Sequence, residues 1–355
     1  MFTADWMFLR RVYLIALLLV GAARLQAQSY IAFHKDTLAK SRSETSAMPP
    51  AFQLKDSALQ QDLQTKLTNT EGRQKLMAQL KSFSHHPDNS GETRKFYYNL
   101  TNVFARIKMY PLAMKCFYKS LDSSVRVIND GAYLGFTARD DSLLERQAQL
   151  LATKRVKSPK ISYQQITQTF NDGKQAAAYA ILIHIKQPIP GKRKVHKLAD
   201  AGHSFITLIK YNTDTTVTSL SFGFYPKHHH PFAGTPLFPY SHSTFKNDYN
   251  YNSDETTGKF ISPRTFDEIL LMVKTFDGIR YNLNNKNCTD FVLDAALLAD
   301  IYIDDTFGKW PLGHGNTPGI TGQGILNNHI YDGCTTGTND LFIDYDPKLL
   351  VIKDK

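Results

Sequence analysis

The pattern of apolar residues changes character near residue 160 of the chain. Before that point apolar residues recur at steps of three and four, which predicts helices over residues 51–160. After it come three runs rich in apolar residues, at 177–185, 202–211 and 217–225, which predict strands. The turn signal at residues 212–215 separates the last two runs and predicts an antiparallel hairpin or meander.

The clearest helical pattern covers residues 97–121 and is interrupted at Tyr110-Pro111. This spacing predicts a helical hairpin, with the small residue Ala113 where the two helices touch. The pattern resembles a single tetratricopeptide repeat, and an unrelated hairpin in a small helical domain explains it equally well. Cys116 lies inside the pattern and is interpreted as a packed core thiol.

The remaining segments complete an outline of the fold. Residues 226–262 are interpreted as loop, and the spacing predicts a helix over 264–276. The Gly- and Pro-rich residues 310–324 form either a wall of a substrate cleft or an ordinary surface loop. We therefore predict an α+β fold in which an antiparallel sheet with packed helices, over 161–355, follows a small α-helical domain over 51–160.

The amino-terminal residues have the features of an export signal. Arg10 and Arg11 precede an apolar run of about a dozen residues, which is short for a membrane-spanning helix of roughly 20. Residues 1–27 are therefore interpreted as a signal peptide, with an uncleaved anchor helix as the alternative, and the polar residues 28–50 as a linker. The mature chain would be exported, periplasmic or secreted, with no integral membrane segment.

Composition narrows the class of protein. Apolar residues make up 42% of the 355 residues and charged residues 21%, which excludes a disordered or collagen-like chain. The formal net charge is +10, and part of it lies in the basic loop 191–197. This loop is interpreted as a solvated turn, with binding of an anionic substrate as the alternative. Because no aromatic-interleaved basic stripe or base-reading motif occurs, we expect no nucleic-acid partner.

The cysteines and histidines do not form a metal-binding pattern. Three Cys are too few for a disulfide scaffold and lack the spacing of a zinc site, although Cys116 and Cys334 could pair in an oxidising compartment. His228-His229-His230 and His242 have no matching carboxylate or Cys spacing. We therefore expect neither a functional metal nor a cofactor.

Cys288 lies at the predicted start of a helix, a position that favours a nucleophilic thiol. An Asn-rich loop precedes it, and an apolar stripe with helical period follows, so Asn287 is a good helix N-cap and Cys288 the first helical residue. The unpaired N–H groups and the positive end of the helix dipole stabilise a thiolate there. The alternative is a structural Cys at a helix start.

A nucleophilic thiol needs a base within hydrogen-bond reach, and His203 is the best candidate. It opens a predicted strand directly after Gly202, where a backbone without Cβ permits close approach. The returning strand follows it and carries Ser219, Ser221 and Tyr225, and the hairpin register decides which of these side chains faces His203.

These two segments resemble a known superfamily. Gly202-His203-Ser204-Phe205-Ile206 followed about 85 residues later by Asn287-Cys288-Thr289-Asp290-Phe291-Val292 is similar to the circularly permuted papain-like cysteine hydrolases, including permuted NlpC-type peptidases and lecithin:retinol acyltransferase-like proteins. The resemblance covers roughly residues 175–335. It implies that Cys288 is the nucleophile, that His203 is the base, and that the Cys288 backbone N–H helps to hold the oxyanion. It also implies a third polar residue on the following strand that orients the imidazole; we choose Ser221, with Ser219 and Tyr225 as the alternatives.

The resemblance also implies a function. Together with the expected export, it predicts a hydrolase that cleaves an amide or ester bond, first of all in peptidoglycan peptides, with Asn287, Thr289 and Asp290 as candidate substrate contacts. One alternative is an inactive papain-like scaffold protein of the cell envelope, with the helical domain engaging a protein partner. Another is a lipid acyl hydrolase or transferase.

Overall fold

The computed structural model describes residues 54–85, 90–121, 131–151, 157–197, 200–227, 234–333 and 341–345. The predicted signal peptide 1–27, the linker 28–50, the cluster His228-His229-His230 and Cys334 lie outside these residues. The segment Pro50–Lys355 forms one compact unit.

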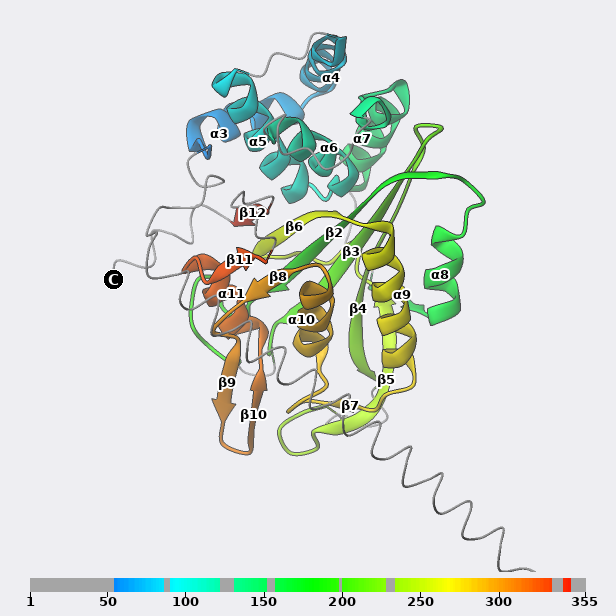
Figure 1. The fold of residues 1–355 in the computed structure, drawn as a ribbon. Coiled ribbons are helices and arrows are strands. Elements are labelled where there is room, and N and C mark those ends of the chain that lie inside the picture. Colours follow the sequence, from blue (N-terminus) through cyan, green and yellow to red (C-terminus); the bar gives the residue numbers. More distant parts are fainter. Residues whose placement is uncertain are drawn as a thin grey trace, which may run out of the picture. The chain divides into compact units, whose positions relative to one another are not determined.

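The described residues confirm the α+β class. Helices come first along the chain, and strands then alternate with helices (Figure 1). The helices are α3 (Ser57–Leu67), α4 (Thr70–His85), α5 (Gly91–Arg106), α6 (Tyr110–Ser120), the 3₁₀ turn η1 (Gly131–Leu134), α7 (Ala138–Leu151), α8 (Tyr163–Phe170), α9 (Pro263–Asp277), α10 (Cys288–Leu298) and α11 (Pro318–Leu326). The predicted helical hairpin is confirmed as α5 and α6, and the helix expected over 264–276 is α9.

The predicted antiparallel sheet is also confirmed, and it has eight strands in the described part of the chain. Its order is β1-β5-β4-β3-β2-β6-β12, and β7 pairs with β5. These strands are β1 (Lys160–Ile161), β2 (Ala176–Lys186), β3 (His203–Asn212), β4 (Val217–Lys227), β5 (Tyr240–Asn247), β6 (Glu255–Ile261), β7 (Tyr281–Asn282) and β12 (Phe342–Tyr345). Two further antiparallel pairs lie outside it: β8 (Ile301–Ile303) with β11 (Ile330–Asp332), and β9 (Phe307–Trp310) with β10 (Gly313–Asn316).

The sheet is buried on both faces, which explains why strand β2 is apolar almost throughout. Alternate residues of a strand point to opposite faces. Ala178, Ala180 and Leu182 join one core cluster with helices of the segment 57–151, whereas Ile181 and Ile183 join a second cluster with α8, α9, α10 and α11. In Figure 1, α9 and α10 lie in front of the sheet.

The amino-terminal helices are tied to the sheet by polar contacts as well as by the shared core. The Tyr98 hydroxyl donates to the Ile343 carbonyl at 3.2 Å, and the Arg106 guanidinium binds the Asp344 carboxylate at 2.8 Å. Both partners belong to β12, and the Tyr211 hydroxyl of β3 donates to the Pro111 carbonyl at 2.7 Å. The division of the chain into two domains at residue 160 stays a prediction.

The interpretation of 226–262 as loop is wrong, because β5 and β6 lie within it. Strand β6 runs between β2 and β12 and carries Glu, Thr, Gly and Lys where a buried strand is expected to be apolar. Two of these polar side chains have partners inside the fold: the Thr257 hydroxyl donates to the Phe342 carbonyl, and Lys259 pairs with Asp332 at 2.7 Å. A Cβ at Gly258 would lie 2.3 Å from the Ile181 carbonyl oxygen.

The Gly- and Pro-rich residues 310–324 also have more structure than a loop. They contain the end of β9, strand β10 and most of α11. Glycines are tolerated in α11 because the helix packs against backbone: a Cβ at Gly319 would lie 1.7 Å from the Lys194 carbonyl oxygen, and one at Gly324 would lie 2.4 Å from that of Asp304. A rule that assigns Gly- and Pro-rich segments to loops misses a helix whose glycines allow close contact with neighbouring backbone.

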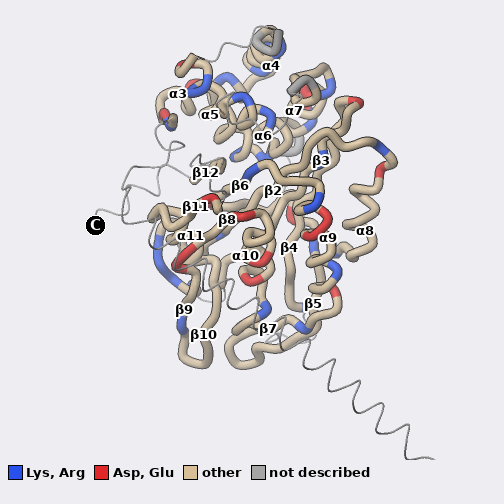
Figure 2. Tube along the Cα trace, viewed as in Figure 1, with Lys and Arg blue, Asp and Glu red and all other residues tan. Residues whose placement is uncertain are grey.

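Charged residues are interspersed over the helices and strands rather than gathered on one element (Figure 2). No helix in the described residues is long and apolar enough to cross a membrane. The basic loop 191–197 connects β2 with the residues before β3, and its Arg193 pairs with Asp305. This ion pair ties the loop to the segment between β8 and β9.

Candidate active site

Helix α10 begins at Cys288, as the sequence predicts. The Asn287 side chain caps it by accepting hydrogen bonds from the backbone N–H groups of Thr289 and Asp290. The Asp290 carboxylate accepts in return from the Asn287 N–H at 2.9 Å, which completes a capping box. These bonds fix the helix start, and with it the position of the Cys288 sulfur.

His203 is the first residue of β3, and Gly202 sets its position. Gly202 has φ +77, and a Cβ there would lie 2.3 Å from the Lys186 carbonyl oxygen, so only glycine fits without strain. The Asp200 side chain accepts from the Gly202 N–H at 2.8 Å and holds the turn. The close approach expected at Gly202 is therefore confirmed.

The structure brings the two predicted side chains together. The imidazole of His203 is hydrogen-bonded to the Cys288 side chain, although 84 residues separate them in the chain. The sulfur also receives hydrogen bonds from the Ser204 backbone N–H and the Thr289 hydroxyl. The hydrogen bonds from His203, Ser204 and Thr289 each favour a thiolate over a thiol.

Asp248, directly after β5, is the carboxylate that orients the imidazole. Its Oδ2 atom lies 2.9 Å from Nε2 of His203, and its side chain is fully buried. Oδ1 accepts from the Tyr225 hydroxyl at 2.6 Å and from the Ser158 hydroxyl at 3.0 Å. Because Nε2 is taken by the carboxylate, Nδ1 is the ring nitrogen left for the Cys288 sulfur.

The expectation that Ser221 orients the imidazole is corrected by this geometry. Its hydroxyl bonds that of Thr207 at 2.7 Å, and Thr207 in turn bonds Nε2 of His184 at 2.8 Å. Ser221 acts on the site only through its carbonyl, which accepts from the Asp248 N–H at 2.9 Å. Asp248 was missed because it lies in the segment taken for loop, so no strand register pointed to it.

The protonation states follow from this arrangement. Burial by itself lowers the pKa of His203, but the Asp248 carboxylate and the Cys288 thiolate outweigh it and raise the pKa to about 9. Burial raises the pKa of Cys288, but the hydrogen bond and charge of His203 outweigh it and lower the pKa below its ordinary value. The two shifts favour a thiolate–imidazolium pair near neutral pH.

Tyr281, on β7, is a further side chain at the sulfur. The Cys288 backbone N–H donates to its hydroxyl oxygen, and the hydroxyl is also hydrogen-bonded to the Cys288 side chain. Burial, with the neighbouring thiolate, raises the pKa of Tyr281, so the phenol stays protonated. The Cys288 N–H and the Tyr281 O–H are therefore two donors beside the reacting atom, and only the first was expected from the sequence.

Aromatic side chains enclose the imidazole. Its ring lies 4.3 Å from the Tyr225 ring and 5.0 Å from the Tyr251 ring, between centroids, and stacks on Phe205 at 5.7 Å. Gly223 leaves room for it, since a Cβ there would lie 2.6 Å from Nε2 of His203. This packing restricts the ring to an orientation in which it reaches both Cys288 and Asp248.

His203 and Cys288 line a cavity of about 520 Å³. Its wall contains Asn287 but neither Thr289 nor Asp290, which corrects two of the three expected substrate contacts. Thr289 is fully buried and hydrogen-bonded to Ser204, and Asp290 accepts from the Asn316 side chain at 2.7 Å. The cavity is otherwise lined by aromatic, apolar and small polar residues: Val195, His196, Asp200, Ala201, Gly202, Phe224, Tyr225, Pro226, Gly234, Thr235, Pro236, Tyr251, Tyr281, Leu283, Trp310, Asn316, Thr317 and Pro318.

Part of the segment 310–324 lines this cavity, whereas a role in holding substrate stays a prediction. Trp310, at the end of β9, and the segment 316–318 before and at the start of α11 line the cavity. The basic loop contributes Val195 and His196, so it is a cavity wall as well as a connection between strands.

The fold and the site together describe an α+β protein with a buried Cys-His-Asp constellation at the wall of a cavity. No protein-family model matches the chain, and comparisons with curated proteins and with solved structures give no match.

Proposed function

We propose that this chain is an exported cysteine hydrolase of the circularly permuted papain-like type, which cleaves an amide or ester bond through Cys288, His203 and Asp248. One observation carries the proposal: His203 is hydrogen-bonded to Cys288 and, through Nε2, at 2.9 Å to the buried Asp248. A nucleophile, a base and a group that orients the base are the parts that acyl transfer needs.

The reaction would proceed in two steps. The Cys288 thiolate attacks the carbonyl carbon, and the oxyanion receives hydrogen bonds from the Tyr281 hydroxyl and the Cys288 N–H. The His203 imidazolium gives its proton to the leaving amine or alcohol, which departs and leaves a thioester. His203, now neutral, takes a proton from water, the water attacks the thioester, and the acid product and thiolate are released.

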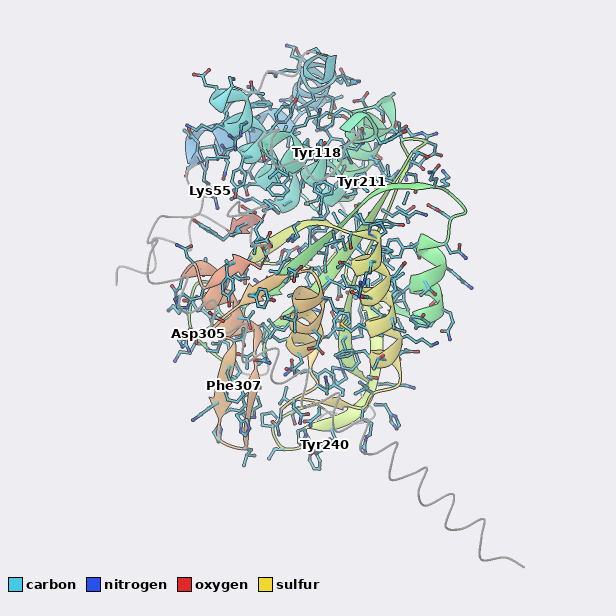
Figure 3. All side chains as sticks on the ribbon, in the orientation of Figure 1. Lys55, Tyr118, Tyr211, Tyr240, Asp305 and Phe307 are labelled. Carbon is cyan, nitrogen blue, oxygen red and sulfur yellow. The ribbon has the colours of Figure 1, made fainter. Side chains whose placement is uncertain are left out.

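The substrate class rests on the resemblance and the expected export. Peptidoglycan peptides are the first candidate, since an exported hydrolase meets them in the cell envelope. A lipid acyl substrate is the second candidate, favoured by exposed apolar side chains close in sequence to the lining residues Pro236 and Trp310: Leu237, Phe238, Tyr240, Phe307 and Leu312. Tyr240 and Phe307 both lie toward the lower end of the molecule in Figure 3. Product analysis on muropeptides against acyl lipids separates the two.

The test compares wild type with Cys288→Ala and uses Cys116→Ala as the control. Cys116 is the other described thiol; it is fully buried and its pKa is raised by burial, so it should neither react nor matter for activity. Cys288→Ala should abolish hydrolysis and labelling by iodoacetamide at pH 6, whereas Cys116→Ala should retain both. A Cys288 that alkylates no faster at pH 6 than a free model thiol would support the inactive scaffold instead.

A further inference from the structure

A second cavity adjoins the catalytic one on the side of Tyr225 and Tyr251. Its volume is about 550 Å³, and it shares Asp200, Tyr225 and Tyr251 with the cavity at Cys288. Its remaining lining residues are Lys157, Ser158, Lys186, Lys246, Asn250 and Asn252. We call it the lysine cavity. Three lysines and one aspartate therefore line a space next to the proposed catalytic residues.

Two of the three lysines lack an ion-pair partner in the described part of the chain. Lys186 pairs with Asp254 at 2.6 Å. Among the residues that the structure describes, neither Lys157 nor Lys246 forms an ion pair. The two oxygens of the neighbouring Asp248 are already bonded to His203, Tyr225 and Ser158.

The strand register places a third lysine, Lys160, near Lys157 and Lys246. Lys246 of β5 stands directly opposite Lys160 of β1 in the antiparallel ladder. Side chains opposite each other in such a ladder lie on the same face, and like charges there repel. Burial, together with the charges of Lys157 and Lys160, lowers the pKa of Lys246, while Asp248 opposes this shift. An anion in the lysine cavity would relieve the repulsion.

Lys246 is also linked to the catalytic residues by contact. Its Nζ lies 4.1 Å from the centroid of the Tyr225 ring, and the same ring packs against His203. The Tyr225 hydroxyl donates to Asp248. A group bound at Lys246 would therefore lie one aromatic side chain away from the His203 imidazole, within the span of a single substrate molecule.

We propose that the lysine cavity binds an anionic group, a carboxylate or a phosphate, of the molecule whose carbonyl reacts at Cys288. This inference rests on the proposed function for the reacting carbonyl, but the anion site itself does not require a reactive thiol. Lysine ammonium groups bind both anions as point charges, so the shared chemistry is a compact negative group.

The experiment measures alkylation of Cys288 by three bromoacetyl probes: N-bromoacetyl-glutamate, N-bromoacetyl-phosphoethanolamine and the neutral diamide of N-bromoacetyl-glutamate. In each reaction the thiolate forms a carbon–sulfur bond and bromide leaves. Each rate constant is divided by the rate constant for bromoacetamide with the same protein, which corrects for the reactivity of Cys288 itself. We expect an anionic probe to react about five- to tenfold faster than the diamide at low salt, with the advantage falling as salt rises. The two anionic probes distinguish carboxylate from phosphate.

The variant Lys157→Gln/Lys246→Gln should abolish this preference, whereas Lys75→Gln, at an exposed site on α4, should keep it. The melting temperature of the double variant should stay the same or rise, because a repulsion with Lys160 has been removed. Equal rates for charged and neutral probes, or a preference that survives in the double variant, would overturn the proposal.

A failure of the proposed function is recognised separately. If bromoacetamide itself does not react faster with Cys288 than with a model thiol, the nucleophile fails, and the anion site is then measured directly. Calorimetry of Cys288→Ala with inorganic phosphate and with citrate should show binding that is lost in the variant that also carries Lys157→Gln/Lys246→Gln. Absence of binding to both anions would overturn the anion site.

Discussion

The Oδ2 atom of Asp248 lies 2.9 Å from Nε2 of His203, and both side chains are almost wholly buried. This contact gives the imidazole its counter-charge and fixes which ring nitrogen faces Cys288. It also joins two segments, the end of β5 and the start of β3, that are not neighbours in the sheet. The charge and the orientation of His203 therefore both depend on the buried carboxylate of Asp248.

Replacing Asp248 by Asn should show this dependence in a pH profile. Without the carboxylate, the pKa of His203 should fall from about 9 toward its ordinary 6.5, and the imidazolium should no longer stabilise the thiolate. We expect alkylation of Cys288 at pH 7 to slow by about ten- to a hundredfold, since one pKa unit corresponds to a factor of ten. Iodoacetamide rates between pH 5 and 10 measure the effect.

Ser221→Ala is the matched control for this variant. Its hydroxyl bonds Thr207 and not the imidazole, so the pH profile should be unchanged. A profile that moves in Ser221→Ala and stays in Asp248→Asn would assign the orienting role to the serine after all.

Gly223→Ala should damage the same contact by steric means. The new Cβ would lie 2.6 Å from Nε2 of His203 and 2.5 Å from Oδ2 of Asp248, so the two groups must move apart. We expect alkylation of Cys288 to slow by at least about tenfold, and the free energy of unfolding to fall by about 1–3 kcal/mol through overpacking. Gly91→Ala is the control, since a Cβ there meets nothing within 4 Å. Equal rates in Gly223→Ala and wild type would contradict the geometry.

His184 should make the fold sensitive to acid. It is fully buried, stacks on Phe205, and bonds the hydroxyls of Thr256 and Thr207. Burial, with a smaller effect of Lys108, lowers its pKa to about 3, whereas the unfolded chain titrates near 6.5. Its contribution to stability is therefore complete above pH 6.5 and is lost as the pH falls toward 3.

Urea unfolding at a series of pH values between 7 and 4 measures this contribution. In His184→Gln the free energy of unfolding should be lower at pH 7 but should fall less steeply with acid, by up to about 1.4 kcal/mol per pH unit. Parallel curves for the variant and wild type would show that His184 does not titrate as the burial implies.

The buried ion pair between Lys115 of α6 and Asp140 of α7 should be essential to the stability of the amino-terminal helices, α3 to α7. Their side chains are each 2% exposed, and the ammonium and carboxylate lie 2.9 Å apart. Lys115→Met leaves a buried carboxylate without its counter-charge, so we expect a loss of about 3–5 kcal/mol in unfolding free energy. The double variant Lys115→Met/Asp140→Leu should lose less than Lys115→Met alone. A double variant that is less stable than the single one would contradict this account.

The parts of the fold that the sequence predicts are those in which local pattern and tertiary packing agree. Strands β2 and β3 are apolar because both faces of the sheet are buried, and α10 begins where Asn287 caps it. Strand β6 could not be found this way, because its Thr257 and Lys259 are satisfied by partners far away in the chain. Helix α11 was missed for a related reason: its glycines reflect close backbone contact and not chain freedom.

The residues of the candidate site also fall into those that the sequence predicts and those that it does not. Cys288 and His203 could be found because a helix start and a strand start leave local signals in the sequence. Asp248 and Tyr281 leave no such local signal. Asp248 follows strand β5, whose position is set by pairing with β4, and Tyr281 lies in the short strand β7, whose position is set by pairing with β5. Thr289 and Asp290 were misassigned because proximity to Cys288 in sequence says nothing about which side of a helix faces the cavity.

Strand β12 has a consequence for how the molecule assembles. It pairs with β6 at the edge of the sheet, and its Ile343 and Asp344 hold Tyr98 and Arg106 of α5, some 240 positions earlier in the chain. Contacts of such separation form late, because a long loop must close first. The α5–α6 hairpin can therefore form early and pack on β2 and β3, whereas the contacts of Tyr98 and Arg106 have to wait until β12 is in place.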